Sequence, residues 1–334
     1  MTLLLVATVM PFPSPPLDWL SRLLEMMPVR GHLDVRCFYG APWRIEHAHA
    51  EPGEVPYHAV LGGSGVLDDG TGGPPLRLVP GDILLLPHGS AHTLHDGSGA
   101  RAIPGRARPS LNLTISENTG TGDRLDVLCG RFILTPPHDR FVRDYLPGRL
   151  VVHAADHSAA TARPGTGAQL AGLVSLMRSE SALENLGGRA MLNALSTAMF
   201  ALTLRLASEA KDPPAGLLAL VGHPRLAPAI AAMFNEPACA WSLPELARLC
   251  HMSRATFVRH FHNSLGRSAS DLLTDIRMTL AANELRKLGM STAAVADKVG
   301  YQSEAAFQRA FKQRMGVTPA QWRRTASAAM RDAP

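Results

Sequence analysis

The sequence predicts an α+β fold in two parts. The first part is a β-barrel completed by a helical hairpin, and the second is an all-α domain in which a long helix joins two helix-turn-helix subdomains. Three observations predict this arrangement: short apolar runs between turn residues up to about position 132, two long apolar helical stretches before position 210, and a repeated helix-turn-helix pattern near the end. The 334 residues, 46% hydrophobic and 18% charged, exceed what one core holds and exclude a disordered chain.

Composition and charge set the predicted boundaries. They are an N-terminal extension (1–16), a first domain (17–210), a linker that begins with KDPPAG (211–221), a second domain (222–327) and a C-terminal tail (328–334). From Trp241 onward the chain has fourteen Lys and Arg against seven Asp and Glu, so this part carries +7 of charge and the remainder −2 within a total of +5. A basic C-terminal part attached to a nearly neutral one is typical of a phosphate-binding module with a partner domain.

The first domain opens with LDWLSRLLEMM (17–27), whose apolar spacing predicts a short amphipathic helix. Runs such as YHAVLGG, LRLVPGDILLLP and LDVLCGRFIL then predict the strands of a sandwich or barrel. Residues 167–210 form two predicted helices separated by Gly187 and Gly188. The second of these helices is apolar around much of its circumference, which fits either packing within one chain or burial between two subunits.

The second domain contains SLPELARLC, HMS and RATFVRHFHNSLG, which read as a helix, a turn and a helix. Ser253 is a favourable N-cap, and Phe257 and Phe261, four residues apart, are expected in the core. The face left for DNA then carries Arg254, Ala255, Thr256 and Arg259.

The same pattern returns about fifty residues later as STAAVADKVG, YQS and EAAFQRAFKQRMG, with Ser303 as the cap and Phe307 and Phe311 facing the core. Between the units, SASDLLTDIRMTLAANELRKLG predicts one helix of roughly twenty residues, or about 30 Å. Successive major-groove faces lie about 34–36 Å apart, so this spacer predicts two units reading one side of a duplex. The outward face of the second unit carries Glu304, Ala305, Gln308 and Arg309.

The region from Gly222 to Arg324 resembles the AraC/XylS-type DNA-binding domain, through MSRATFVRHF, IRMTLAANELR and VADKVGYQSEAAFQRAFKQRMGVTPAQWRR. The resemblance implies two subdomains that bind double-stranded promoter DNA, a homodimer, and RNA polymerase as a further partner. Arg259 and Arg309 are the strongest candidates for base contact, with phosphate contact as the alternative. The implied DNA-contacting positions are Arg254, Ala255, Thr256, Val258 and Arg259 in the first unit, and Ser303, Glu304, Ala305, Gln308 and Arg309 in the second.

The first domain is similar to the cupins. PGDILLLPHGSAHTLHD (80–96) matches the second cupin motif at Gly81, Pro87, Gly89 and His92, with Asp96 where Asn is usual. His47 and His49 supply the HxH of the first motif, but the Glu and Gly that should follow are out of register. The resemblance therefore implies a cupin-like sensor and dimerisation domain.

No cofactor is required on this interpretation, but imidazoles could still converge on a divalent metal. The predicted ligands are His47, His58, His92 and His95, and the alternative is that they are ordinary barrel histidines. A metal-dependent cupin enzyme with an accessory DNA-binding domain is the competing function, although the first motif does not complete its metal triad. A DNA-repair alkyl-transfer protein would need zinc-ligand cysteines in the first half, where only Cys37 and Cys129 occur. We therefore expect a regulator and no enzyme.

DWLSRLLEMM, CFYGAPW, VLCGRF and HPRL together resemble the reactive-chlorine-responsive subgroup of AraC-type regulators. That resemblance places Cys37 and Cys129 at the two positions associated with oxidation, and implies an oxidant or small-molecule effector. Such chemistry needs a thiolate near a cation, for which Arg36 and Arg131 are candidates, while two buried apolar cysteines are the alternative. The apolar run at positions 1–10 is too short to span a membrane, so we expect a cytoplasmic protein without membrane contact.

Overall fold

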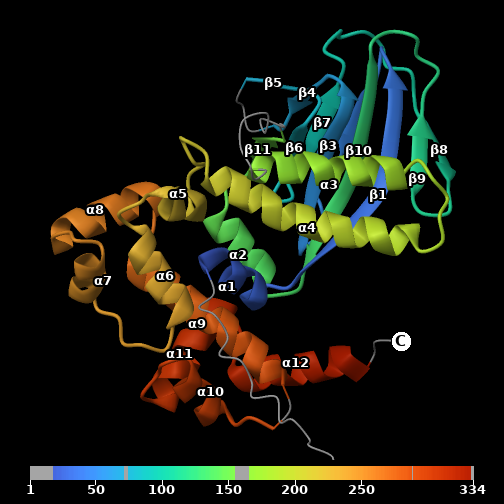
Figure 1. Ribbon diagram of the computed structural model, residues 1–334. Coiled ribbons are helices and arrows are strands. Elements are labelled where there is room, and N and C mark those ends of the chain that lie inside the picture. Colours follow the sequence, from blue (N-terminus) through green and yellow to red (C-terminus); the bar gives the residue numbers. More distant parts are fainter. Residues whose placement is uncertain (1–17, 71–73, 155–164, 288, 332–334) are drawn as a thin grey trace, which may run out of the picture.

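The computed structural model describes residues 18–70, 74–154, 165–287 and 289–331, and it confirms the predicted α+β class (Figure 1). The strands all lie in the first part of the chain. They are β1 (Val29–Gly40), β2 (Arg44–His47), β3 (Glu54–Gly63), β4 (Gly65–Asp68), β5 (Leu76–Leu78), β6 (Asp82–Leu85), β7 (His92–His95), β8 (Arg106–Pro109), β9 (Thr114–Glu117), β10 (Arg124–Leu134) and β11 (Leu150–His153).

Two sheets form the cupin-like body. The larger has the strand order β11-β6-β3-β10-β1-β9-β8, and the smaller has the order β2-β7-β4-β5. Because side chains alternate along a strand, β3 sends Tyr57 and Ala59 to one face of the large sheet and His58 and Val60 to the other. The face with Val60 packs against residues of the small sheet such as Leu94, so an apolar core lies between the two sheets.

Four helices belong to the same body: α1 (Trp19–Met26), α2 (His138–Tyr145), α3 (Thr166–Glu180) and α4 (Gly188–Ser208). The helices α3 and α4 form the predicted hairpin and lie across the outer face of the large sheet (Figure 1). The backbones of β1 and α4 meet at Gly31, where a Cβ atom would lie 2.5 Å from the Thr197 nitrogen. Only glycine permits this approach.

The helix α4 is the one described helix long and apolar enough to cross a membrane by length and composition. Its buried residues include Leu192, Met199, Phe200 and Leu204, which contact the sheet and α3. One face of α4 is therefore packed within the protein.

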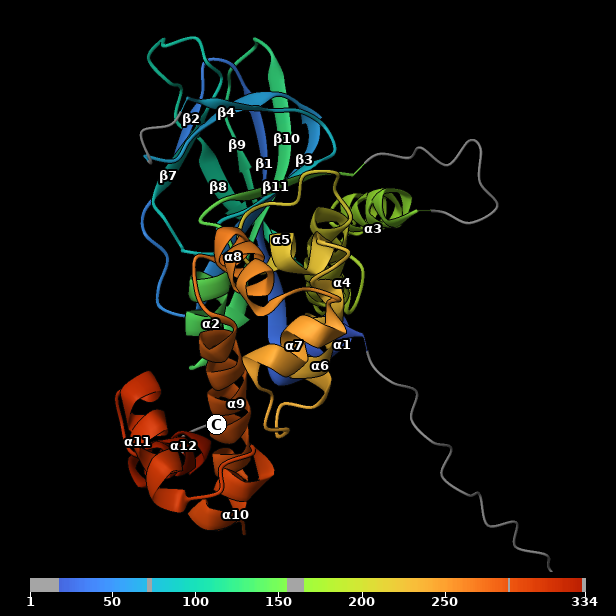
Figure 2. The same cartoon turned by 90° about the vertical axis from the view of Figure 1, so that its left-hand side faces the viewer.

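The second part is entirely helical among the described residues, and Figure 2 shows the two helix-turn-helix units at opposite ends of α9. The 18 residues of α9 confirm the predicted spacer helix. The helices of this part are α5 (Leu217–Gly222), α6 (Ala227–Asn235), α7 (Leu243–Leu249), α8 (Arg254–Leu265), α9 (Ala269–Arg286), α10 (Thr292–Lys298), α11 (Glu304–Met315) and α12 (Pro319–Arg331).

Two predicted connecting segments differ from the structure. Residues 217–221 of the predicted linker lie in α5, because Leu217, Leu218 and Leu220 bury their side chains against α4, α6 and α8. The predicted tail also begins too early, since α12 continues to Arg331. The predicted N-terminal extension, 1–16, and residues 332–334 lie outside the described residues.

The two parts make direct contact through α1, α2, α6 and α9. The Asn283 amide donates to the Met26 carbonyl (2.8 Å), and His138 Nε2 donates to Asn283 Oδ1 (2.9 Å). The Tyr145 hydroxyl donates to Asp275 of α9 (2.5 Å). The helical second part is therefore docked on the cupin-like body by partly buried polar contacts as well as by apolar packing.

Candidate functional site

The two helix-turn-helix units have the same local design. In the first, His251 takes a φ of 51° in the turn, and Ser253 caps α8 by accepting a hydrogen bond from the Thr256 amide (3.2 Å). In the second, Gly300 takes a φ of 85°, and Ser303 caps α11. Both predicted caps are confirmed.

Two phenylalanines anchor each second helix. Phe257 and Phe261 of α8 are buried, as are Phe307 and Phe311 of α11. Because these rings point inward, the opposite faces of α8 and α11 are open to solvent. Of the predicted DNA-contacting residues, Thr256 is half-buried and the exposed ones are Arg254, Ala255, Val258, Arg259, Ser303, Glu304, Ala305, Gln308 and Arg309.

The two exposed faces differ in charge. Arg254 and Arg259 form no ion pair within the described part of the chain, and neither does Arg309 of the second unit. On α11 the Gln308 amide donates to Glu304 Oε1 (2.9 Å), so these two side chains are already paired in the free protein. The face of α8 therefore carries two unpaired arginines that can contact phosphate. The face of α11 carries one unpaired arginine beside the hydrogen-bonded Gln308 and Glu304.

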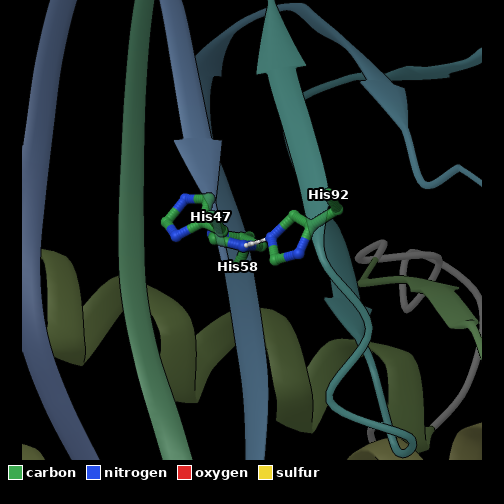
Figure 3. Close-up of side chains that lie close together, drawn as sticks. All are labelled: His47, His58 and His92. Carbon is green, nitrogen blue, oxygen red and sulfur yellow. Dashed lines mark hydrogen bonds between the residues drawn. The ribbon is translucent and has the colours of Figure 1, made fainter. Parts of the chain in front are cut away.

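Three histidines meet between the two sheets (Figure 3). His58 comes from β3 of the large sheet, whereas His47 and His92 come from the paired strands β2 and β7 of the small sheet. The Nε2 atoms of His58 and His92 lie 2.7 Å apart, and the His47 ring stacks on His92 with centroids 4.5 Å apart. One candidate ligand atom from each residue lies within 4.8 Å of the others.

Burial keeps these rings neutral near pH 7. Loss of solvation lowers the pKa of His47 to about 4, with a further contribution from His92. Desolvation also lowers the pKa of His92, and it lowers the pKa of His58 well below its usual value. Neutral imidazole is the form that can coordinate a metal.

The two predicted sensor cysteines adjoin this cluster. Cys129 lies opposite His58 in the pairing of β10 with β3, and its Sγ is 3.1 Å from His58 Nδ1. Cys37 is a diagonal neighbour of Cys129 on β1, and both side chains belong to the apolar cluster between the sheets. The neighbouring Cys129 lowers the pKa of Cys37 against the opposing effect of burial, while Cys37 and burial together raise the pKa of Cys129.

Several residues are not where the sequence suggested. His95 is three positions after His92 on β7, so strand alternation directs it away from the cluster, and its Nδ1 accepts from the Gly97 amide instead. His49 of the HxH pair is exposed beyond the end of β2. The predicted metal set is thereby reduced to His47, His58 and His92.

The expected cations are not beside the thiols. The Arg36 guanidinium pairs with Asp126 (2.8 Å), and Arg131 pairs with Asp34 (3.0 Å). Arg36 is adjacent to Cys37 and so projects from the other face of β1. Arg131 is two residues from Cys129 on the same face of β10, but its guanidinium is held by Asp34 and Glu54. The polar neighbours of Cys37 are instead Cys129 and the Tyr39 hydroxyl. Tyr39 could have been found from the sequence, since it lies two residues from Cys37 and shares its face.

The histidine cluster fits a divalent metal ion. His47 Nε2 is buried and has no hydrogen-bond partner among the described residues, which is costly unless a ligand satisfies it. Tetrahedral nitrogen ligands about 2.0–2.1 Å from a metal lie roughly 3.3 Å from one another. His58 and His92 need only separate slightly from their present 2.7 Å to reach that geometry.

Comparison with known proteins covers almost the whole chain. A family model described as Cupin matches residues 18–209, and one described as Helix-turn-helix domain matches residues 246–325. An HTH-type transcriptional regulator of Haemophilus influenzae is 29% identical over 93% of this chain and 100% of its own length. The RCS-specific HTH-type transcriptional activator RclR of Escherichia coli K12 is 28% identical (92% and 97%), and the HTH-type regulator MtrA of Neisseria gonorrhoeae is 29% identical (92% and 98%).

Proposed function

We propose a mode of action for this chain, which belongs to the AraC-type DNA-binding transcription regulators with an N-terminal cupin domain. It is a regulator and not an enzyme. We propose that α8 and α11 contact promoter DNA through their exposed faces, with Arg259 and Arg309 at the centre of each contact. The repeated capped helix with two inward phenylalanines and an outward arginine is the observation that supports this most strongly.

The proposal is tested by genome-wide binding of the protein in cells with and without an oxidant. We expect discrete promoter sites whose occupancy changes after treatment, because a ligand or modification that favours one state shifts the population toward it. Binding without sequence preference would contradict specific reading by the two units. Because such a protein must reach chromosomal DNA and RNA polymerase, we also propose a cytoplasmic location and direct contact with the polymerase.

A second copy of this chain is the proposed partner of the α3–α4 hairpin. Four large apolar side chains are exposed there, namely Leu176, Leu183, Leu186 and Met191, with Leu186 96% exposed. Exposed apolar patches of this kind mark association surfaces, and twofold dimers are the commonest assembly. The double variant Leu176→Glu, Met191→Glu should sediment as a monomer, whereas the wild-type protein should sediment as a dimer. A wild-type monomer at micromolar concentration would contradict the dimer.

A divalent metal ion is the proposed ligand of His47, His58 and His92. The neutral rings and the unpartnered His47 Nε2 support this assignment. A bound ion would hold the large and small sheets together, because its ligands come from both. Purified protein should contain about one Zn²⁺, Fe²⁺ or Mn²⁺ per chain, and His47→Ala should lose it.

Cys37 and Cys129 are the proposed oxidant sensors. The diagonal position of Cys37 beside Cys129 and the lowered pKa of Cys37 support attack by Cys37 on an oxidant followed by closure onto Cys129. The relative described as RCS-specific agrees with a reactive-chlorine signal. Cys37→Ser should abolish induction by hypochlorous acid, and unchanged induction would reject the thiol mechanism.

A further inference from the structure

A chain of hydrogen bonds links the sensor thiols to the histidine cluster, and its direction can be deduced. His92 Nδ1 lies 3.0 Å from the Ser90 carbonyl oxygen, which can only accept, so this nitrogen carries the proton. In neutral His92, Nε2 is then an acceptor. The Nε2 of His58, 2.7 Å away, must therefore be the donor.

The donor of the hydrogen bond between His58 Nδ1 and Cys129 follows from the tautomer of His58. If Nε2 of this neutral ring carries the proton, Nδ1 has only a lone pair to offer. The Cys129 thiol, 3.1 Å from Nδ1, is consequently the donor of that hydrogen bond. Without a metal, protons thus point from Cys129 to His58, from His58 to His92, and from His92 to Ser90.

Metal binding is incompatible with this order of protons. A metal held by His58 Nε2 occupies the lone pair of that nitrogen, so the ring proton must reside on Nδ1. Nδ1 then donates, and Cys129 Sγ changes from donor to acceptor. Metal-bound histidines generally have such an outer acceptor, and its loss typically costs 10–100-fold in metal affinity.

We propose that Cys129 is the outer partner of the metal ligand His58, and that oxidation of Cys37 and Cys129 to a disulfide weakens metal binding at the histidine cluster. The proposal rests on the metal site and on the thiol pair proposed above. A thiol or thiolate at Cys129 accepts the Nδ1 proton of metal-bound His58. A disulfide sulfur is a poorer acceptor and is drawn toward Cys37, so the oxidised protein holds its metal less tightly.

The oxidation balances with hypochlorous acid as the two-electron oxidant. The Cys37 sulfur attacks chlorine, a sulfenyl chloride forms, and hydroxide leaves and takes the thiol proton as water. The Cys129 sulfur then displaces chloride as the S–S bond forms. In the metal-free protein its proton passes to His58 Nδ1, to which the Cys129 thiol already donates. In the metal-bound protein Nδ1 already carries a proton, so the thiol proton is released to solvent. Two thiols and one hypochlorous acid give one disulfide, water, chloride and a proton.

The coupling is reciprocal by thermodynamic linkage. If the disulfide weakens metal binding by a given factor, bound metal disfavours the disulfide by the same factor. The two proposed sensing chemistries are then one device, in which His58 transmits the state of the thiols to the metal and the state of the metal to the thiols.

The test measures Zn²⁺ affinity by competition with a chromophoric chelator on the full-length protein. All proteins carry Cys239→Ser, because Cys239 is exposed and would form disulfides between molecules. Reduced protein is compared with protein treated with diamide, a disulfide-forming oxidant. We expect oxidation to lower Zn²⁺ affinity about 10- to 100-fold.

Three variants show which cysteine property causes the loss of Zn²⁺ affinity. Cys129→Val, which removes the acceptor but fills the space, should bind as weakly as oxidised protein, and Cys129→Ser should keep most of the affinity. Cys37→Ser keeps the contact between Cys129 and His58 but cannot form the disulfide, so its affinity should match that of reduced protein before and after diamide.

Two negative results have separate meanings. Zn²⁺ binding that depends on His47 but is equal in reduced, oxidised and Cys129→Val protein would overturn the coupling and leave the metal site standing. If the protein shows no Zn²⁺ binding that depends on His47, the metal site and the coupling are both overturned. The comparison of reduced with oxidised Cys239→Ser protein needs no substitution near the site, so a misfolded variant cannot mimic either result.

Discussion

The first and second helix-turn-helix units share a design but not a core. Phe257 and Phe261 of the first unit belong to one apolar cluster that runs continuously from the large sheet and α4 through α5 and α6 into α9. Phe307 and Phe311 of the second unit pack in a separate cluster with α10 and the second half of α9. The first unit thus shares the apolar core of the cupin domain, whereas the second unit has a core of its own.

This difference indicates where a signal can act. A change in the cupin domain is transmitted to the first unit through a shared core, because close-packed interiors transmit strain. The second unit is reached mainly through α9 and a few polar contacts, among them the bond from Arg140 to the Arg314 carbonyl. We expect the signal to change the first unit and the second to supply constant affinity.

Removing one phenylalanine ring from each core tests whether the two cores unfold separately, and it should change stability more than any other substitution considered. Phe257→Ala and Phe307→Ala should each cost about 3–5 kcal/mol, since both create a cavity at a fully buried site. Phe257→Ala should lower the unfolding temperature of the cupin domain, whereas Phe307→Ala should expose only the second unit. Hydrogen exchange along the chain checks this. Loss of protection throughout the chain in both variants would show that the two cores unfold as one.

Tyr145 tests the polar link between the cupin domain and α9. Its hydroxyl donates to Asp275, whose other partners are Arg267 (3.6 Å) and Arg314 (3.4 Å). Tyr145→Phe removes a hydrogen bond to a charged group and should destabilise the protein by about 1.5–3 kcal/mol in chemical denaturation. Tyr301→Phe is the matched control, because no hydrogen bond of its hydroxyl occurs among the described residues. Equal stability of the two variants would mean that the link contributes nothing.

Arg259 and Arg309 distinguish the contributions of the two units to DNA binding. Each alanine variant should weaken binding to a mapped promoter site by about 1–3 kcal/mol, or 5- to 150-fold. If the signal acts on the first unit, oxidant should still change the affinity of Arg309→Ala by the wild-type factor and should change that of Arg259→Ala much less. Titrations at fixed salt measure the six affinities, those of the wild-type protein and both variants with and without oxidant. An equal response of both variants would place the signal on both units.

The helical half was predictable because its determinants are local. Ser253 and Ser303 cap helices within three residues, and the paired phenylalanines define a face within one helical turn. The predicted linker failed where local composition was overridden, because Leu217 and its neighbours pack against helices distant in sequence.

The barrel site was less predictable because it depends on strand register. His47, His58 and His92 were among the expected ligands, but their convergence and the exclusion of His95 follow from which face of each strand they occupy. The contact between His58 and Cys129 joins residues 71 positions apart, and no local pattern announces it. Sequence proximity was also misleading for the two arginines, since Arg36 faces the opposite side of its strand from Cys37 and Arg131 is held by Asp34 and Glu54.

The smallest test uses the glycines that end α8 and α11. Gly266 and Gly316 take φ values of 72° and 76°, and a Cβ at either would meet nothing within 4 Å. Alanine at either position therefore costs only backbone strain, about 1 kcal/mol. Gly172→Ala, at an open position inside α3, is the control and should stabilise slightly. Gly266→Ala should lower the midpoint temperature of the main unfolding transition, whereas Gly316→Ala should destabilise the second unit alone. Strain at the end of a helix destabilises only the core in which that helix packs. A main transition lowered equally by both glycine variants would contradict the separation of the two cores.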